Sequence, residues 1–560
     1  MDALFAINKQ VTKKNLSDFF LIAEYVLSES DPALEMPEDD RWMAGVYGKV
    51  RDHSAALRKG ICETFVIFSV HGNDLFRHRL GVDVESHVSQ LIRKLLTPLS
   101  LKKLLSHNDD LPLYAEAAPD EFLNLIEEDL RQPQPVVLGL LKPADVGPFS
   151  SPTRAGLLWA LECLAWKHLG RVNMILAQLS ETVINDNWNN KPINSIESIY
   201  RSWLPQTAAP LADRIKALEK LTRQFPDIGW QICMAQLYVG DRTGEYSYRP
   251  LWRNDASGAG RSVTQAEYHQ FMNKVISIVV AWPRHDQNTL GDIIERFPIL
   301  PEKDQALVWD LIDDWADSEV DENAKADLRE RIRRFAFTRL SRRRGLKDVA
   351  ISRARALYEK LQPRDIVARH AWLFDQDLVE DPNDDSDDGK FDYEKSRKKT
   401  FALRAAAMQE VWDERGFDGV MALLSMTKMP YAVGESLMGC ITNMNASTAF
   451  LRKCLSVTGD LESKVAFCMR GLLFSLSDKK RSAVISAVAE GLAYGQVAQL
   501  FCCARSTHTL GDYSTSTVRK FGIATGWKFP RIHPATAKMN CGRWSTAFLK
   551  QNVRGPLFMS

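Results

Sequence analysis

Very few residues of this chain combine the types and the spacing that metal or covalent chemistry requires. Cys502 and Cys503 precede His508, but adjacent cysteines lack the Cys-x-x-Cys spacing of zinc sites, and burial at the end of an apolar helix is the competing explanation. The segment Asp384–Gly389 resembles the start of a calcium loop, but the twelfth position is Lys395 instead of the bidentate glutamate. The sequence therefore predicts no metal and no other cofactor.

Catalytic motifs are missing as well. The chain contains no G-x-x-x-x-G-K-[ST] phosphate loop, no G-x-S-x-G nucleophile turn and no H-E-x-x-H helix. Gly491 and Gly495 stand four residues apart in an apolar segment, which predicts close packing of a helix and no nucleotide site. We expect a protein that is not an enzyme, with an enzyme of unfamiliar site chemistry as the alternative.

One loop carries the residue types that are enriched at protein interfaces. Helical patterning stops between residues 240 and 262, and this segment mixes aromatic residues with arginines. Tyrosine, tryptophan and arginine dominate binding hot spots, and loops on rigid scaffolds often carry recognition. The candidate partner-binding residues are Tyr246, Tyr248, Arg249, Trp252 and Arg253. The alternative is a loop that folds back and buries its aromatic side chains on adjacent helices.

A second candidate surface is a run of arginines after residue 328. On a helix, several of these side chains fall on one side, where they could meet phosphate groups. The candidate nucleic-acid-binding residues are Arg331, Arg333, Arg334, Arg342 and Arg343. The acidic residues between 313 and 327 supply the alternative, in which the arginines form ion pairs on a helical face.

The composition is that of an ordinary soluble protein. The 560 residues include 72 Lys and Arg against 71 Asp and Glu, a formal net charge of +1, which argues against attraction of the whole protein to nucleic acid or to an anionic membrane. The nine cysteines are scattered without paired spacing, as in a reducing compartment. We find no signal peptide and no apolar run of about 18 residues, so we expect a cytoplasmic protein without a membrane partner.

Apolar residues recur at steps of three and four along most of the chain, which predicts helices, including one near 41–50 and one from Ser54 to His71. Proline followed by acidic or polar residues predicts helix starts at Pro119, Pro226 and Pro363. A fixed repeat of about 33 or 34 residues is absent. The expected fold is all-α, an elongated α-solenoid of irregular HEAT- or TPR-like helical hairpins.

Breaks in this pattern divide the chain. We expect helical repeats over 1–133, Trp-rich repeats over 134–239, a loop over 240–262, repeats with the arginine-rich helix over 263–377, an acidic mobile insertion over 378–392, repeats over 393–504 and a basic irregular tail over 505–560. The tail has nine Lys and Arg against one acid, Asp512. It is either a flexible basic tail or a stretch in which the normal sequence has been replaced.

Several stretches are similar to a family of large bacterial proteins. They are WMAGVYGKVRDHSAALRKGICET (42–64), LLWALECLAWKHLGRVNMILAQL (157–179), NKPINSI (190–196), SWLPQTAAPLADRI (202–215) and YRPLWR (248–253). The likeness extends over about residues 1–510. The family resembles STAND-type or other NTPase proteins of antiphage defence, in which an effector and a nucleotide-binding module precede a helical-repeat sensor.

The resemblance implies a sensor or scaffold that binds another protein, either a phage component or NTPase and effector modules encoded upstream. This chain departs from the family pattern because it has no NTPase or effector module and because its helices do not continue beyond about Leu510. Both departures are expected of a fragment of a longer protein. A helical-repeat protein that binds nucleic acid through the arginines and the basic tail is the alternative function.

Overall fold

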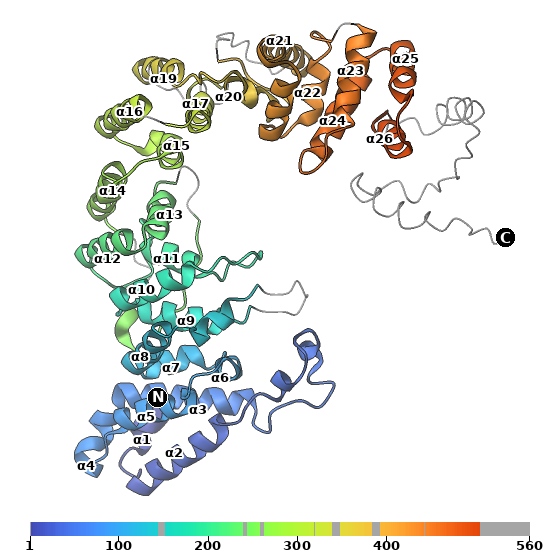
Figure 1. Cartoon of the computed structure of the whole chain (residues 1–560). Helices are drawn as coiled ribbons and strands as arrows, with labels where there is room; N and C mark the ends of the chain where they lie inside the picture. Colours follow the sequence, from blue (N-terminus) through green and yellow to red (C-terminus); the bar gives the residue numbers. More distant parts are fainter. Residues whose placement is uncertain are drawn as a thin grey trace, which may run out of the picture. The chain divides into compact units, whose positions relative to one another are not determined.

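The computed structural model describes residues 2–143, 152–238, 243–257, 263–318, 320–338, 348–382, 392–441 and 443–504. Within these ranges every regular element is a helix, which confirms the all-α prediction (Figure 1). The chain forms two compact units. Unit 1 comprises residues 1–284 and 296–307, and unit 2 comprises residues 285–295 and 308–560.

Unit 1 is built from short helices in close succession. Its α-helices are α1 (Asp2–Ile7), α2 (Lys13–Leu27), α3 (Ala55–Ile67), α4 (His78–Leu80), α5 (Val84–Leu96), α6 (Leu101–Ser106), α7 (Leu111–Ala117), α8 (Pro119–Leu130), α9 (Ala155–Ala165), α10 (Leu169–Ser180), α11 (Pro192–Tyr200), α12 (Leu211–Gln224), α13 (Pro226–Gln236) and α14 (Gln265–Val280). A π-helical segment, η3 (Phe68–Arg77), continues α3, and short 3-10 segments are η1 (Pro32–Glu35), η2 (Glu38–Met43), η4 (Val136–Leu141), η5 (Asn254–Ala256) and η6 (Phe297–Ile299).

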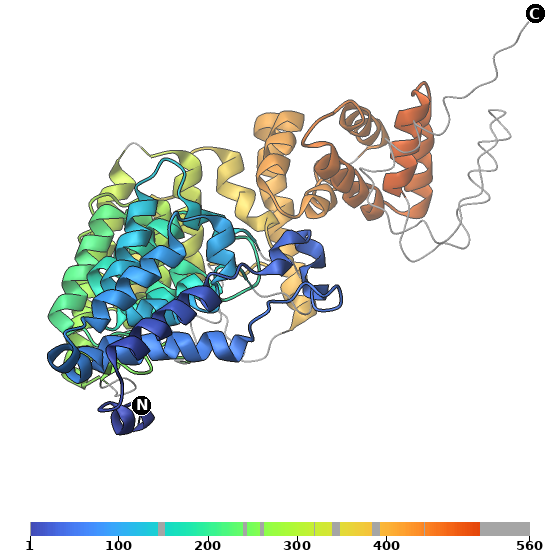
Figure 2. The same ribbon diagram turned by 90° about the horizontal axis from the view of Figure 1, so that it is seen from below.

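The helices of unit 1 pack in two rows. In one row α5 contacts α8, α8 contacts α10, α10 contacts α12 and α12 contacts α14; in the other, α3 contacts α7, and α7, α9, α11 and α13 follow one another. Figures 1 and 2 show these helices side by side, blue through green. From α7 to α14, successive helices of the chain fall alternately in one row and in the other.

Unit 2 contains the remaining helices. They are α15 (Gln287–Glu295), α17 (Glu322–Ala336), α19 (Asp348–Lys360), α20 (Ile366–His370), η7 (Ala371–Phe374), α21 (Tyr393–Met426), α22 (Pro430–Ser436), α23 (Met444–Cys454), α24 (Glu462–Ser475), α25 (Asp478–Ala489) and α26 (Tyr494–Ala504), together with α16 (Glu302–Asp317), which begins in unit 1. One buried apolar cluster extends through the helices from α20 to α26.

Glycines allow two helices of unit 2 to approach backbone to backbone. A Cβ on Gly434 of α22 would lie 1.9 Å from the carbonyl oxygen of Cys468, and a Cβ on Gly471 of α24 would lie 2.0 Å from that of Tyr431. The close helix packing expected at Gly491 and Gly495 is wrong, because a Cβ at either position would meet nothing within 4 Å. Gly434 and Gly471 are each the single glycine of their helix, so a glycine spacing of four residues does not identify such a contact. The neighbouring helix decides it.

Proline begins a helix where the residue before it has a non-helical backbone conformation. α8 and α13 begin at Pro119 and Pro226 as predicted, and the residues before them have nearly the same non-helical backbone angles, φ −134° and ψ 69° at Ala118 and φ −133° and ψ 72° at Phe225. The predicted start at Pro363 is wrong. α20 begins at Ile366 because the Asp365 carboxylate accepts a hydrogen bond from Ala368 N–H and caps the helix there.

The helix expected near residues 41–50 is also wrong. Only the short η2 forms, and it is followed by a turn that ends at Gly48 with φ +64°. The N–H of Lys49 bonds to the carbonyl of Ala44 and that of Gly48 to the carbonyl of Gly45, the pattern of a Schellman helix end. The predicted helix from Ser54 does form, capped by the Ser54 hydroxyl, and continues through η3 past His71.

Candidate interaction surface around residues 243–257

Residues 243–257, here called the strap, lie across helices that are distant in sequence. Three side chains from those helices and their connections accept hydrogen bonds from strap backbone N–H groups. Gln206 Oε1 accepts from Ser247 at 3.1 Å, and Glu162 Oε2 accepts from Tyr248 at 3.0 Å. Irregular backbone needs such partners wherever water is displaced.

The strongest anchor is Glu116 of α7, whose side chain is almost fully buried. Its Oε1 accepts hydrogen bonds from the N–H groups of Trp252 at 2.6 Å and Arg253 at 2.9 Å. The Arg253 guanidinium in turn donates from Nε to the Glu116 carbonyl at 2.6 Å and from Nη2 to the Ala117 carbonyl at 3.3 Å. These carbonyls belong to the last turn of α7, where helical acceptors lack intrahelical donors. Arg253 is therefore an anchor of the strap.

Glu162 of α9 holds the middle of the strap. It accepts from the Ser195 hydroxyl at 2.6 Å and from Tyr248 N–H, while burial raises the pKa of its carboxyl group in spite of these two bonds. Trp166 Nε1 donates to the Tyr248 carbonyl at 3.1 Å, and the Tyr248 ring stacks on Trp159 with centroids 6.3 Å apart. The N–H and the carbonyl of Tyr248 are thus both hydrogen-bonded to side chains.

The strap also presents side chains to solvent. Tyr246 is 56% exposed and Leu251 is 61% exposed. The exposed Arg249 guanidinium lies 5.4 Å from the Tyr246 ring centroid. Of the five candidate residues, Tyr246 and Arg249 face outward, and Tyr248 and Trp252 are half-buried. Arg253 anchors the strap to the end of α7. The two alternatives drawn from the sequence therefore each describe part of the loop.

Two residues missed by the sequence reasoning extend this surface. Leu251 stands between the predicted residues, and Trp159 of α9 remains 39% exposed beside Tyr248. Trp159 lies in a helix whose other apolar residues are buried, so no periodicity distinguishes it from a core position. We call Tyr246, Arg249, Leu251 and Trp159 the strap surface.

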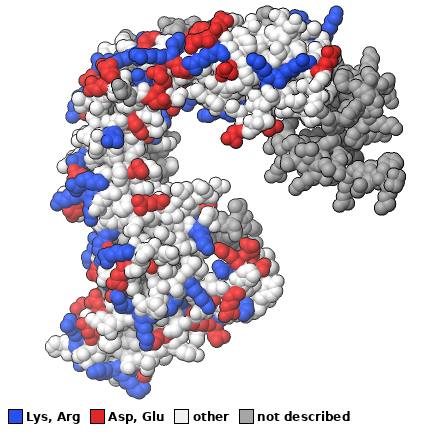
Figure 3. All heavy atoms as spheres, in the orientation of Figure 1, with Lys and Arg blue, Asp and Glu red and all other residues white. Residues whose placement is uncertain are grey.

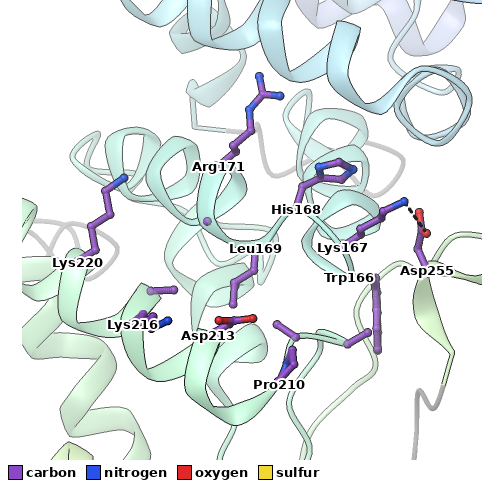
Figure 4. A pocket seen from close by; sticks show the side chains of 14 residues that line it. Trp166, Lys167, His168, Leu169, Arg171, Pro210, Asp213, Lys216, Lys220 and Asp255 are labelled. Atoms are coloured by element: carbon purple, nitrogen blue, oxygen red, sulfur yellow. Dashed lines mark ion pairs between the residues drawn. The ribbon is translucent and has the colours of Figure 1, made fainter.

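A hollow of about 650 Å³ lies beside the strap, between the starts of α10 and α12 (Figure 4). Its charged lining is largely neutralised. Lys167 pairs with Asp255 of the strap at 3.6 Å, and Arg171 binds Glu127 at 2.9 Å and also Asp120. The exposed lysines 216 and 220 share the lining with Asp213. After these ion pairs, two lysines face one aspartate, so the lining keeps a small excess of positive charge on exposed side chains, and we assign no ligand to the hollow.

The described arginines of the second candidate surface are engaged inside unit 2. Arg331 pairs with Asp292 at 2.7 Å. Arg333 is almost fully buried, pairs with Glu330 at 2.7 Å and lies 4.6 Å from the Trp372 ring centroid. Arg334 shares Glu330 at 2.8 Å. Arg342 and Arg343 lie outside the described residues.

The surface charges are mixed in sign. Figure 3 shows blue and red side chains interspersed over the face it presents, on each unit. Ion pairs on such a surface compete with phosphate groups for the same arginines. The geometry of α17 therefore favours the ion-paired helical face.

One buried cluster contains the residue types of a cysteine hydrolase. Cys62 Sγ lies 3.9 Å from Asp110 Oδ1, and His107 Nδ1 lies 3.5 Å from Asp110 Oδ2. The Arg58 guanidinium binds Asp110 at 2.6 Å and also approaches His107 Nδ1. Cys62 has no exposed surface, and burial raises the pKa of its thiol well above 9.0. A protonated, inaccessible thiol is not a nucleophile. The contacts of the cluster instead join Arg58 and Cys62 of α3 to the connection that precedes α7.

His107 predicts a pH dependence of stability. Burial holds its pKa below 6.5, in spite of the nearby Asp110 carboxylate, so the imidazole is neutral in the folded protein and gains a proton on unfolding. The unfolded state then binds more protons at acidic pH, and the free energy of unfolding should fall as the pH is lowered through 6.5. Denaturant titrations on either side of this pH measure the slope. The variant His107→Gln, which retains an acceptor for Arg58, should show a smaller slope; an equal slope in both proteins would contradict the assignment.

The described ranges contain neither a metal-ligand cluster nor a membrane-spanning helix. There, no group of three or more His, Cys, Asp or Glu residues is placed to hold a metal ion. Cys503 is buried and Cys502 is exposed, whereas His508 and the segment Asp384–Gly389 lie outside the described residues. None of the described helices combines the length and the apolar character needed to cross a membrane.

Comparisons with known proteins do not place the chain in a family. No family model matches it, and no curated protein matches it. Among solved structures, the crystal structure of an engineered protein matches at 12% identity, over 81% of this chain and 97% of that chain, with a TM-score of 0.19. So low a TM-score supports no conclusion about fold or function.

Proposed function

We propose that this chain is a non-catalytic helical-repeat protein that binds another protein through the strap surface. The observation that carries the proposal is the attachment of the strap to two carboxylates on different helices, the buried Glu116 and the half-buried Glu162. A loop fixed in this way loses little conformational entropy on binding, so its exposed aromatic and arginine side chains can contribute more of their contact energy to affinity.

The two rows of helices in unit 1 support the scaffold part of the proposal. In unit 1 each helix of a row contacts the next. In α-solenoids, such rows form extended binding surfaces. The resemblance to sensor regions of bacterial defence proteins, which we infer from the sequence alone, makes a phage component, or an NTPase module encoded upstream, the first partner to test, in the cytoplasm. The nucleic-acid alternative has less support, because Arg331, Arg333 and Arg334 already pair with carboxylates.

The strap surface predicts the effect of a triple substitution on partner binding. Tyr246→Ala, Arg249→Ala and Leu251→Ala together remove three of the four side chains of the strap surface without touching the anchors, so affinity should fall at least about tenfold. Partners are identified by affinity capture from phage-infected and uninfected cells and then measured with the purified partner. Tyr238→Ala is the matched control, because Tyr238 is 57% exposed and lies outside the strap. Equal affinity of the triple variant and the control would refute the role of the strap.

A further inference from the structure

Helix α2 carries an apolar stripe that faces away from unit 1. Its inner face is buried against α3 and α5 through Leu16, Ala23, Val26 and Leu27. The opposite face should be polar in a helix at the surface of a helical array. Instead, Leu21 is 64%, Ile22 is 58% and Tyr25 is 73% exposed.

Charged residues extend this stripe at both ends in a definite order. At steps of three and four residues, the outward positions of the helix are Lys14, Asp18, Leu21, Ile22 and Tyr25, and Glu29 follows at the next step, beyond the end of the helix. Lys14 and Asp18 form an ion pair at 2.7 Å and remain 82% and 46% exposed in their side chains. Glu29, just after the helix, is held by hydrogen bonds from Asp52 and His53 and is 18% exposed.

This order is symmetric about a point between residues 21 and 22. Lys14 is as far from that point as Glu29, Asp18 is as far as Tyr25, and Leu21 and Ile22 flank it. If a second α2 lies antiparallel on the first, Lys14 of each copy faces the Glu29 end of the other copy. The Tyr25 hydroxyl of each copy then faces the Asp18 carboxylate of the other. A parallel arrangement would instead place Lys14 beside Lys14 and Asp18 beside Asp18, which costs energy.

We infer that the outer face of α2 is an interface at which two copies of this chain associate about a twofold axis, with their α2 helices antiparallel. A twofold interface uses the same surface on both subunits, so the surface must complement itself. The stripe satisfies this requirement in its apolar centre and in the order of its charges. The inference is independent of the strap surface.

One helix on each side buries less than the roughly 800 Å² per partner of standard stable interfaces. The association should therefore be weak, with a dissociation constant in the micromolar range. Sedimentation velocity of the full chain, from low to high micromolar concentration, measures it. A wild-type chain that stays monomeric over this range would overturn the inference.

Two substitutions test the surface. Leu21→Asp with Ile22→Asp places charge at the centre of the apolar stripe and should weaken dimerisation at least about tenfold. The matched control is Val183→Asp, because Val183 is 79% exposed and lies between α10 and α11. Circular dichroism verifies that both variants retain their helices. A dimer that survives the double substitution would assign the interface to another surface.

Cross-linking tests the register. Chains carrying Asp18→Cys and Tyr25→Cys, one of them lengthened by a size tag, are mixed in a background with Cys502→Ser and Cys541→Ser. The antiparallel arrangement predicts cross-links between the two variants and few within either one. Predominant links between identical positions would overturn the proposed orientation.

Discussion

Glu116→Ala is expected to release the carboxyl-terminal half of the strap from α7. The substitution removes the acceptor of the Trp252 and Arg253 N–H groups, and each buried donor left without a partner costs on the order of 1–3 kcal/mol. The strap is attached locally, so the free energy of its local opening should fall by about 3 kcal/mol in the variant. The effect on unfolding of the whole unit should be smaller.

Hydrogen exchange measures this opening directly. The amide protons of Trp252 and Arg253 should exchange about a hundredfold faster in Glu116→Ala than in the wild type, which corresponds to roughly 3 kcal/mol. Trypsin should also cleave more rapidly after Arg253, which is followed by Asn254. Glu116→Gln is the matched control, because its amide oxygen can still accept both hydrogen bonds, and it should remain close to the wild type. Unchanged exchange in Glu116→Ala would show that the strap is held by other contacts.

The second large effect is expected at the contact between α22 and α24. A methyl group at Gly471 would meet the Tyr431 carbonyl at 2.0 Å, and one at Gly434 would meet the Cys468 carbonyl at 1.9 Å. Both obstacles are backbone atoms of a helix, which cannot rotate away as a side chain can. Gly471→Ala should therefore separate the two helices and lower the free energy of unfolding of unit 2 by about 3 kcal/mol or more.

Gly495→Ala is the control for this prediction. A Cβ at Gly495 meets nothing within 4 Å, and alanine favours a helix more than glycine does, so stability should be unchanged or slightly higher. Thermal and denaturant unfolding followed by circular dichroism compares the two variants. A Gly471→Ala protein as stable as Gly495→Ala would mean that the helices can separate without loss of packing.

The sequence alone was sufficient for the class of fold and for many helix boundaries, because those depend on neighbours within one or two turns. The apolar steps of three and four residues identify the helices, and the Asp83 carboxylate caps α5 by accepting from Ser86 N–H. The predicted helix near residues 41–50 and the predicted helix start at Pro363 were wrong, because two local structures compete closely at each place. In both places a turn or a cap a few residues away had more favourable hydrogen bonds.

The candidate site was predicted in part. Tyrosine, tryptophan and arginine types pointed to the loop around residues 246–253, since such types are enriched at interfaces. Which of them anchor and which are displayed could not be predicted, because that depends on partners far away in the chain. Trp252 N–H reaches an acceptor 136 residues away and Tyr248 N–H one 86 residues away.

The tertiary structure alone decided the roles of Glu116 and Glu162. In the sequence each is a single acidic residue within an apolar helix, and nothing local distinguishes a buried acceptor from a solvated charge. A buried carboxylate is stable only where donors converge on it, and those donors are brought there by the folding of the strap. The sequence by itself thus determined the helices and the absence of familiar catalytic motifs, whereas the arrangement of distant hydrogen-bond partners determined which surface the protein can present.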